Sequence, residues 1–109
     1  MEIEKALSLI DKEWESDTGL LVLFRMSSDV EVERLDAFIE AVNSIREYYQ
    51  GKKWIEKHLV YLLLGFYRTL SASQGHWKVS HPEGLGPEKV YEVLSSILDV
   101  FTDDAIYPL

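Results

Sequence analysis

The sequence contains no cysteine, and this absence excludes several kinds of site. Without thiols the chain can form no disulfide framework, no cysteine nucleophile and no zinc site with thiolate ligands. The protein therefore needs no oxidising compartment for its folding. An apolar run of the roughly 20 residues that a bilayer span requires is also missing.

Common catalytic motifs are absent as well. The sequence has no glycine-rich phosphate loop, no His-Glu-x-x-His pair and no nucleophile elbow. Its first residues, MEIEKALSLIDKEWE, are amphipathic and acidic, whereas a secretion signal has a basic start and a continuous apolar run. We expect a cytoplasmic protein that is not an enzyme and that binds no cofactor or metal.

Positive charge is scarce: 11 Lys and Arg residues stand against 19 Asp and Glu residues, which gives the 109-residue chain a formal net charge of -8. Nucleic acids and anionic membranes are therefore disfavoured as partners, since both are bound through basic groups. The acidic excess lies in residues 1–47 and 88–109, while residues 48–87 carry more basic than acidic groups. A basic protein is the partner that this acidic surface favours.

The stretch WIEKHLVYLLLGFYRTL, residues 54–70, is the most apolar part of the chain. Residues 59–67 include no charged side chain, and a helix that is apolar on every side must be enclosed. We predict an all-α fold: one domain over residues 1–109, a single helical bundle of about four principal helices around this central apolar helix. The central helix is expected to run from about residue 52 to 72, with every other helix packed on it.

Two segments precede the second long helix. Apolar residues at helical spacing predict a first helix of roughly 13 residues that ends before the segment at 16–19. The apolar run LLVLFRM, residues 20–26, fits either a buried strand or a short helix, and we favour a short helical or irregular segment. The first helix presents Ile3, Ala6, Leu7, Ile10 and Trp14 on one face.

Two further helices follow from caps and periodicity. One of Ser27, Ser28 and Asp29 is expected to cap the start of a helix that runs to about Tyr49. Gln50 and Gly51 fit its C-cap. Because the connection to the central helix is short, the two helices should be antiparallel neighbours. Its expected core residues are Val32, Leu35, Phe38, Ile39, Val42, Ile45 and Tyr49. A last helix should open at Pro87, bury Val90, Val93, Leu94, Ile97 and Phe101, and end near Asp103.

Four carboxylates of the second long helix form what we call the acidic ridge: Glu33, Asp36, Glu40 and Glu47. At 100° per residue they fall within about 60° of one another, opposite the apolar face. The ridge either keeps a small apolar protein soluble or docks a basic protein, with Tyr48 beside it as a further contact.

The long loop at 73–86 offers a second group of candidates. Trp77 is either tucked onto the bundle as a lid, the favoured alternative, or displayed as an interface anchor. His76, His81 and Glu83 match no metal-site spacing. The alternative function is a small helical enzyme or ligand-binding bundle whose pocket combines His58, Tyr61 and Arg68 with these two loop histidines.

Residues 14–45, from Trp14 to Ile45, resemble small bacterial immunity proteins of polymorphic toxin and contact-dependent inhibition systems. In that pattern an acidic segment precedes a glycine, an apolar run and an arginine, which lead into an acidic amphipathic helix. The matching residues here are Gly19, Leu20, Leu21, Leu23, Phe24 and Arg25. The resemblance implies a cytoplasmic protein that blocks a cognate toxin, a basic domain in the case of a nuclease, without performing chemistry. The resemblance transfers no individual toxin-contacting residue. The chain is expected to be either a monomer or a homodimer that pairs through residues 20–24.

Overall fold

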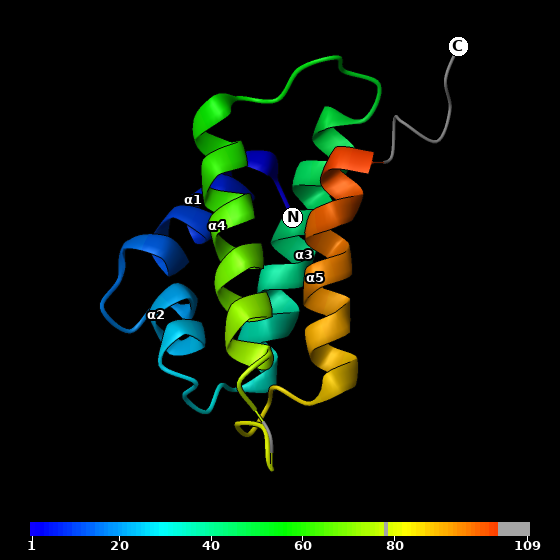
Figure 1. Cartoon of the computed structure of the whole chain (residues 1–109). Coiled ribbons are helices and arrows are strands. Elements are labelled where there is room, and N and C mark those ends of the chain that lie inside the picture. Colours follow the sequence, from blue (N-terminus) through cyan, green and yellow to red (C-terminus); the bar gives the residue numbers. More distant parts are fainter. Residues whose placement is uncertain (78, 103–109) are drawn as a thin grey trace.

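The computed structural model in Figure 1 describes residues 1–77 and 79–102 of the chain. Within these residues it contains helices and no strand, so the predicted all-α bundle is confirmed. The helices are α1 (Ile3–Glu15), α2 (Leu20–Arg25), α3 (Val32–Tyr49), α4 (Lys57–Gln74) and α5 (Pro87–Thr102). None of them is both long and apolar enough to cross a membrane.

The first two helices follow the apolar pattern of the sequence. Helix α1 has the predicted 13 residues and buries Ala6 and Ile10. The ambiguous run that follows is a helix, as favoured, and α2 turns Leu20 and Phe24 into the core. A helix of six residues leaves most of its terminal backbone groups without a partner inside the helix, and side chains from elsewhere satisfy two of them: Glu13 Oε1 accepts the Leu20 N–H over 3.1 Å, and the Ser73 hydroxyl donates to the Phe24 carbonyl over 2.6 Å.

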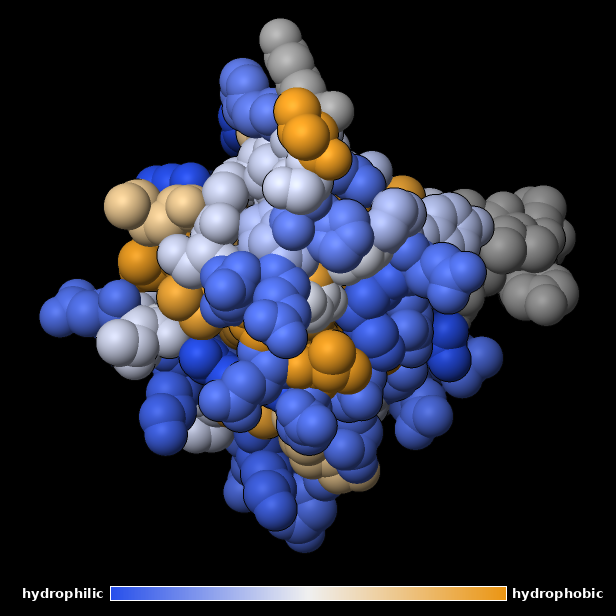
Figure 2. Space-filling model, turned by 90° about the horizontal axis from the view of Figure 1, so that it is seen from below, coloured by the Kyte–Doolittle hydropathy of each residue, from blue (hydrophilic) through white to orange (hydrophobic). Residues whose placement is uncertain are grey.

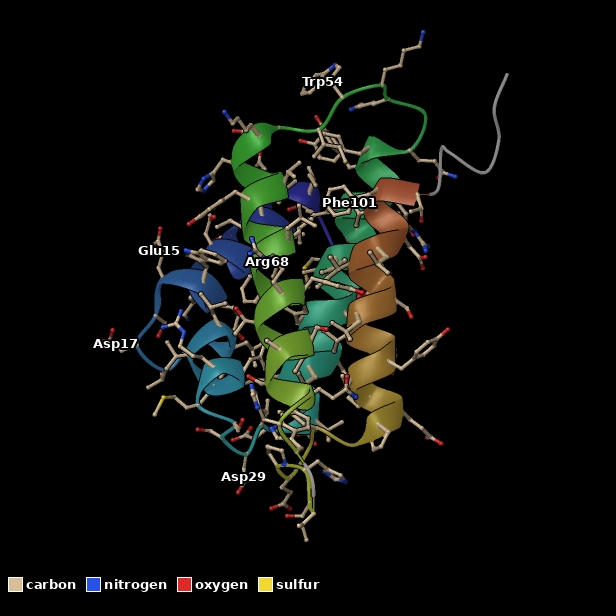
Figure 3. The ribbon with its side chains drawn as sticks, in the orientation of Figure 1. Glu15, Asp17, Asp29, Trp54, Arg68 and Phe101 are labelled. Atoms are coloured by element: carbon tan, nitrogen blue, oxygen red, sulfur yellow. The ribbon has the colours of Figure 1, made fainter. Side chains whose placement is uncertain are left out.

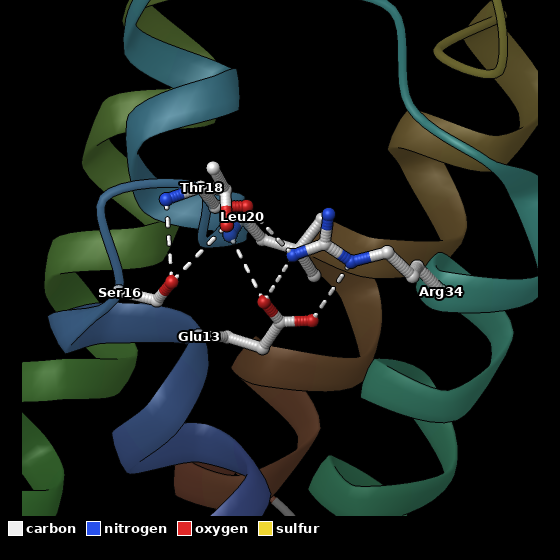
Figure 4. A network of polar contacts seen from close by, with 5 residues as sticks. All are labelled: Glu13, Ser16, Thr18, Leu20 and Arg34. Atoms are coloured by element: carbon white, nitrogen blue, oxygen red, sulfur yellow. Dashed lines mark hydrogen bonds and ion pairs between the residues drawn. The ribbon is translucent and has the colours of Figure 1, made fainter.

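A partly buried ion pair joins the corner between α1 and α2 to α3 (Figure 4). Arg34 of α3 donates hydrogen bonds to both carboxylate oxygens of Glu13, the residue two positions before the end of α1. Glu13 Oε1 also accepts the backbone N–H of Leu20 at the start of α2, over 3.1 Å. This network was not predicted, because its members are far apart in the sequence.

Helix α3 begins at Val32, so the predicted N-cap among residues 27–29 is wrong. Ser27 has a left-handed backbone (φ 52°), and Asp29 Oδ1 accepts the N–H of Glu83 from the distant loop over 2.8 Å. The side chain that could have capped α3 is therefore used in a tertiary contact. Val32, predicted to lie in the core, is 41% exposed as a consequence of its place in the first turn.

The end of α3 matches its prediction, whereas the start of α4 does not. Gln50 is the C-cap and Gly51 follows with φ +80°, a conformation that glycine adopts without steric cost. Helix α4 then begins at Lys57, several residues later than predicted. Trp54 lies in the intervening loop, where it is 68% exposed (Figure 3).

Helix α4 is central in the bundle, as predicted, and packs against α1, α2 and α5. The prediction that every other helix packs closely on it is wrong for α3, which reaches α4 through side chains without close backbone contact. Phe66, which is fully buried, meets Trp14 of α1, Phe24 of α2 and Phe38 of α3 edge-on, with ring centroids 5.5, 6.5 and 4.9 Å apart. Such aromatic pairs contribute stability beyond their buried area.

The prediction that α4 is enclosed on every side is wrong. Tyr61 is 64% exposed, Leu64 is 40% exposed, and Arg68 is exposed on the same side (Figure 3). In Figure 1, α4 lies in front of α3 with α1 and α2 to one side and α5 to the other, so no described helix covers its front.

Helix α5 begins at Pro87 as predicted and buries Val90, Val93 and Ile97, while Leu94 and Phe101 are partly buried. The predicted helix end near Asp103 lies outside the described residues. The chain crosses from α4 to α5 at the lower end of the bundle. Seen from that end, the surface is largely hydrophilic with small, separate apolar areas (Figure 2).

Candidate functional site

The acidic ridge lies on the outer side of α3. Glu33, Asp36, Glu40 and Glu47 are all exposed, because α3 turns Leu35, Phe38, Val42 and Ile45 to the core. Like charges one helical turn apart, such as Asp36 and Glu40, cost a few tenths of a kcal/mol. The ridge therefore does not stabilise α3 by its own spacing.

Three of the four ridge carboxylates line an open groove between α3 and α5, with a volume of about 360 Å³. A fourth carboxylate in this groove, Glu92, comes from α5 and was not among the predicted site residues. Glu33 is not part of the groove lining. The lining residues are Met1, Asp36, Ile39, Glu40, Asn43, Ser44, Glu47 and Glu92.

Lys89 of α5 joins two of the acidic groups. Its ammonium donates to Asp36 Oδ1 over 2.7 Å and to Glu92 Oε2 over 3.0 Å. The hydrogen bond to Asp36, and after it the bond to Glu92, raises the pKa of Lys89 above its ordinary value. Asp36 is thus paired across α3 and α5, although the isolated helix pattern placed it facing solvent alone.

Tyr48 extends the acidic ridge toward the upper end of the bundle. Its ring is 46% exposed, and Lys52 Nζ lies 3.6 Å from the ring centroid. The neighbouring Tyr49, which is buried, packs edge-on against the same ring at 5.0 Å. Tyr48 is therefore an exposed aromatic held in place on both sides.

Trp77 is tucked against the bundle, the alternative that the sequence favoured. Its ring is partly buried against the core, and its Nε1–H donates to Ser27 Oγ over 2.8 Å. The indole thus joins the loop after α4 to the turn before α3. This position does not display the ring as an interface anchor.

The alternative pocket is not assembled as one site. Tyr61, Arg68 and His76 line one open groove, but His58 lies outside it, with Nε2 3.8 Å from Asp11 Oδ1. His81 lines a separate hollow of about 190 Å³ with Trp77. Since the loop folds toward residues 27–30, it carries His81 away from the exposed face of α4. The described residues contain no group of three or more His, Asp or Glu side chains placed to hold a metal ion.

Comparisons with known proteins find no relative of this chain. No protein-family model, no curated protein and no solved structure matches this chain. The functional argument therefore depends on the geometry and charge of the surface.

Proposed function

We propose that the protein is a non-enzymatic binding protein that docks a basic protein on the acidic ridge and the groove beside it. The observation that carries this proposal is the open groove of about 360 Å³, in which carboxylates of Asp36, Glu40 and Glu47 from α3 meet Glu92 from α5. Two long helices pack side by side to present these groups on one surface.

The expected effect of this surface is on the rate and selectivity of association. Exposed charges at the rim of an interface steer an oppositely charged partner and change the association rate more than the dissociation rate. Lys89 partly neutralises Asp36 and Glu92, and the N-terminal ammonium of Met1 lies 3.9 Å from Glu40 Oε1. Glu33 and Glu47 therefore supply most of the attraction. Tyr48 adds the kind of exposed aromatic that often anchors an interface.

Within this class, we infer an immunity protein that acts in the cytoplasm and neutralises a cognate bacterial toxin with a basic surface. Support comes from the resemblance of residues 14–45 to immunity proteins of polymorphic toxin and contact-dependent inhibition systems. That stretch includes α2 and most of α3, and so most of the acidic ridge. Blocking a toxin requires contact and charge complementarity rather than a catalytic group.

Co-expression tests the proposal. The product of the adjacent gene should be toxic when expressed alone in a bacterial host, and co-expression of this chain should restore growth and give a complex that co-purifies. A matched pair of variants then identifies the surface: neutralisation of the acidic ridge should weaken rescue, and neutralisation of four carboxylates elsewhere should leave it unchanged. A harmless neighbour that does not co-purify with this chain would contradict the proposal.

A further inference from the structure

The uncovered face of α4 forms a second, larger groove. Its volume is about 700 Å³, and its lining comes from α1, α2, α4 and the loop that follows α4. It lies on the side of α4 where α1 and α2 pack, whereas the acidic groove lies between α3 and α5 (Figure 1). The residues that give it its chemistry are Trp14, Arg25, Tyr61, Leu64, Arg68 and His76.

Trp14 provides a fixed aromatic platform in this groove. Its ring packs against Tyr61 at 5.3 Å between centroids and against the buried Phe66 at 5.5 Å. Gly65 permits this close approach, because a Cβ atom at that position would overlap the Trp14 ring atoms Cζ3 and Cη2. Tyr61 and Leu64 stay exposed beside the platform.

The charge of this groove is opposite to that of the whole chain. Arg25 and Arg68 are exposed, and neither guanidinium has a hydrogen bond or ion pair with any residue in the described ranges. No carboxylate occurs among the groove-lining residues described. In a protein of net charge -8, two arginines without an internal partner are available to an acidic ligand.

We propose that this groove binds an acidic segment of a partner protein in an extended conformation. From Tyr61 to Ser73 the groove follows α4 for about 18 Å, at 1.5 Å per residue. An extended peptide covers that length with about five or six residues. Its carboxylates would pair with Arg25 and Arg68, while an apolar side chain packs on Trp14 and Tyr61.

The composition of the groove favours a protein segment over other anions. Tryptophan, tyrosine and arginine are the residues that most often dominate protein interfaces, and this groove combines all three. A nucleic acid or an anionic membrane presents many more negative charges than two arginines can pair, so the net charge of -8 repels either of them more strongly than it repels a short acidic segment. This proposal is independent of the acidic ridge and stands or fails separately.

Fluorescence anisotropy with a defined peptide tests the inference. The probe is a fluorescein-labelled hexapeptide of alternating glutamate and leucine, compared with a glutamate and serine peptide and a lysine and leucine peptide. We expect saturable binding of the first peptide only, weakened by salt. The variant Arg25→Gln with Arg68→Gln should bind it about tenfold more weakly, since two exposed charge pairs are lost. Tyr61→Ala should weaken binding as well.

The matched control is Lys52→Gln with Lys53→Gln, which removes the same charge from the exposed loop before α4 and should leave peptide affinity unchanged. Circular dichroism would verify that each variant is folded. Equal affinity of the arginine variant, or no binding of the glutamate and leucine peptide, overturns the proposal. So does tighter binding of a hexathymidine oligonucleotide or of phosphatidylglycerol vesicles, because the groove would then serve a different class of partner.

Discussion

Arg34 and Glu13 form a two-point contact between α3 and α1. Nη2 of Arg34 lies 2.5 Å from Oε1 of Glu13, and Nε lies 3.3 Å from Oε2. Arg34 Nη2 also donates to the backbone carbonyl of Thr18 over 3.0 Å. Because the Glu13 carboxylate accepts the Leu20 N–H too, one acidic group fixes the end of α1, the start of α2 and the position of α3.

Replacement of Glu13 should destabilise the protein. Glu13→Ala leaves the Leu20 N–H and the Arg34 guanidinium without their acceptor, so we expect the free energy of unfolding to fall by about 2 kcal/mol. Urea denaturation measures this change. Glu15→Ala, an exposed carboxylate of the same helix, is the control and should change stability by less than about 0.5 kcal/mol. Equal effects of the two substitutions would contradict this account of the corner.

A methyl group at Gly65 should have opposite effects in two backgrounds. In the wild type, Gly65→Ala forces the Trp14 ring to move, and we expect a loss of about 1–2 kcal/mol despite the better helix propensity of alanine. In a Trp14→Leu background the overlap is relieved, and the same substitution should stabilise α4 by up to about 1 kcal/mol. Thermal or urea unfolding of the wild type, the two single variants and the double variant gives the coupling energy between positions 14 and 65. The same sign in both backgrounds would show that Trp14 does not lie across Gly65.

Lys89 should make the free energy of unfolding depend on pH in the alkaline range. Because its folded-state pKa is raised by Asp36 and Glu92, its contribution is fully present below its unfolded pKa, about 10.4. The contribution is lost as the pH rises through the higher folded value. The stability difference between wild type and Lys89→Met should therefore be constant from pH 7 to about 10 and should shrink above that range. Urea titrations at each pH measure it, and a difference that persists undiminished at pH 12 would disprove the pairing.

Much of the fold follows from local patterns in the sequence. The apolar spacing of α1 gives its length, Pro87 marks the start of α5, and Gly51 marks the end of α3. These features depend on residues within one or two turns of each other. Periodicity along a single helix is sufficient to predict them.

The errors arise where distant residues interact. Asp29 lies two residues before Glu31, the N-cap of α3, and its Oδ1 accepts the N–H of Glu83 instead. Asp36 is paired because α5 brings Lys89 beside it. The exposed face of α4 was missed for a related reason: an apolar segment indicates burial, but the number of helices available to cover it depends on the whole fold. Tyr61 is the clearest example. The sequence could identify the candidate carboxylates, but only packing could show which of them share a groove.

The most direct test of the central claim is the association rate between this protein and the adjacent-gene toxin, measured across a range of salt concentrations. The test variant neutralises the acidic ridge with Glu33→Gln, Asp36→Asn, Glu40→Gln and Glu47→Gln. The control removes equal charge with Glu4→Gln, Glu15→Gln, Asp17→Asn and Glu56→Gln, all at exposed positions outside the acidic groove.

At low salt the ridge variant should associate about tenfold more slowly than the wild type, and the difference should vanish near 0.5 M salt, where the Debye length is only about 4 Å. The control should slow much less, because steering depends on where the charges lie. Equal rates and affinities for the wild type and the ridge variant at every salt concentration would contradict the proposal that this face docks the partner.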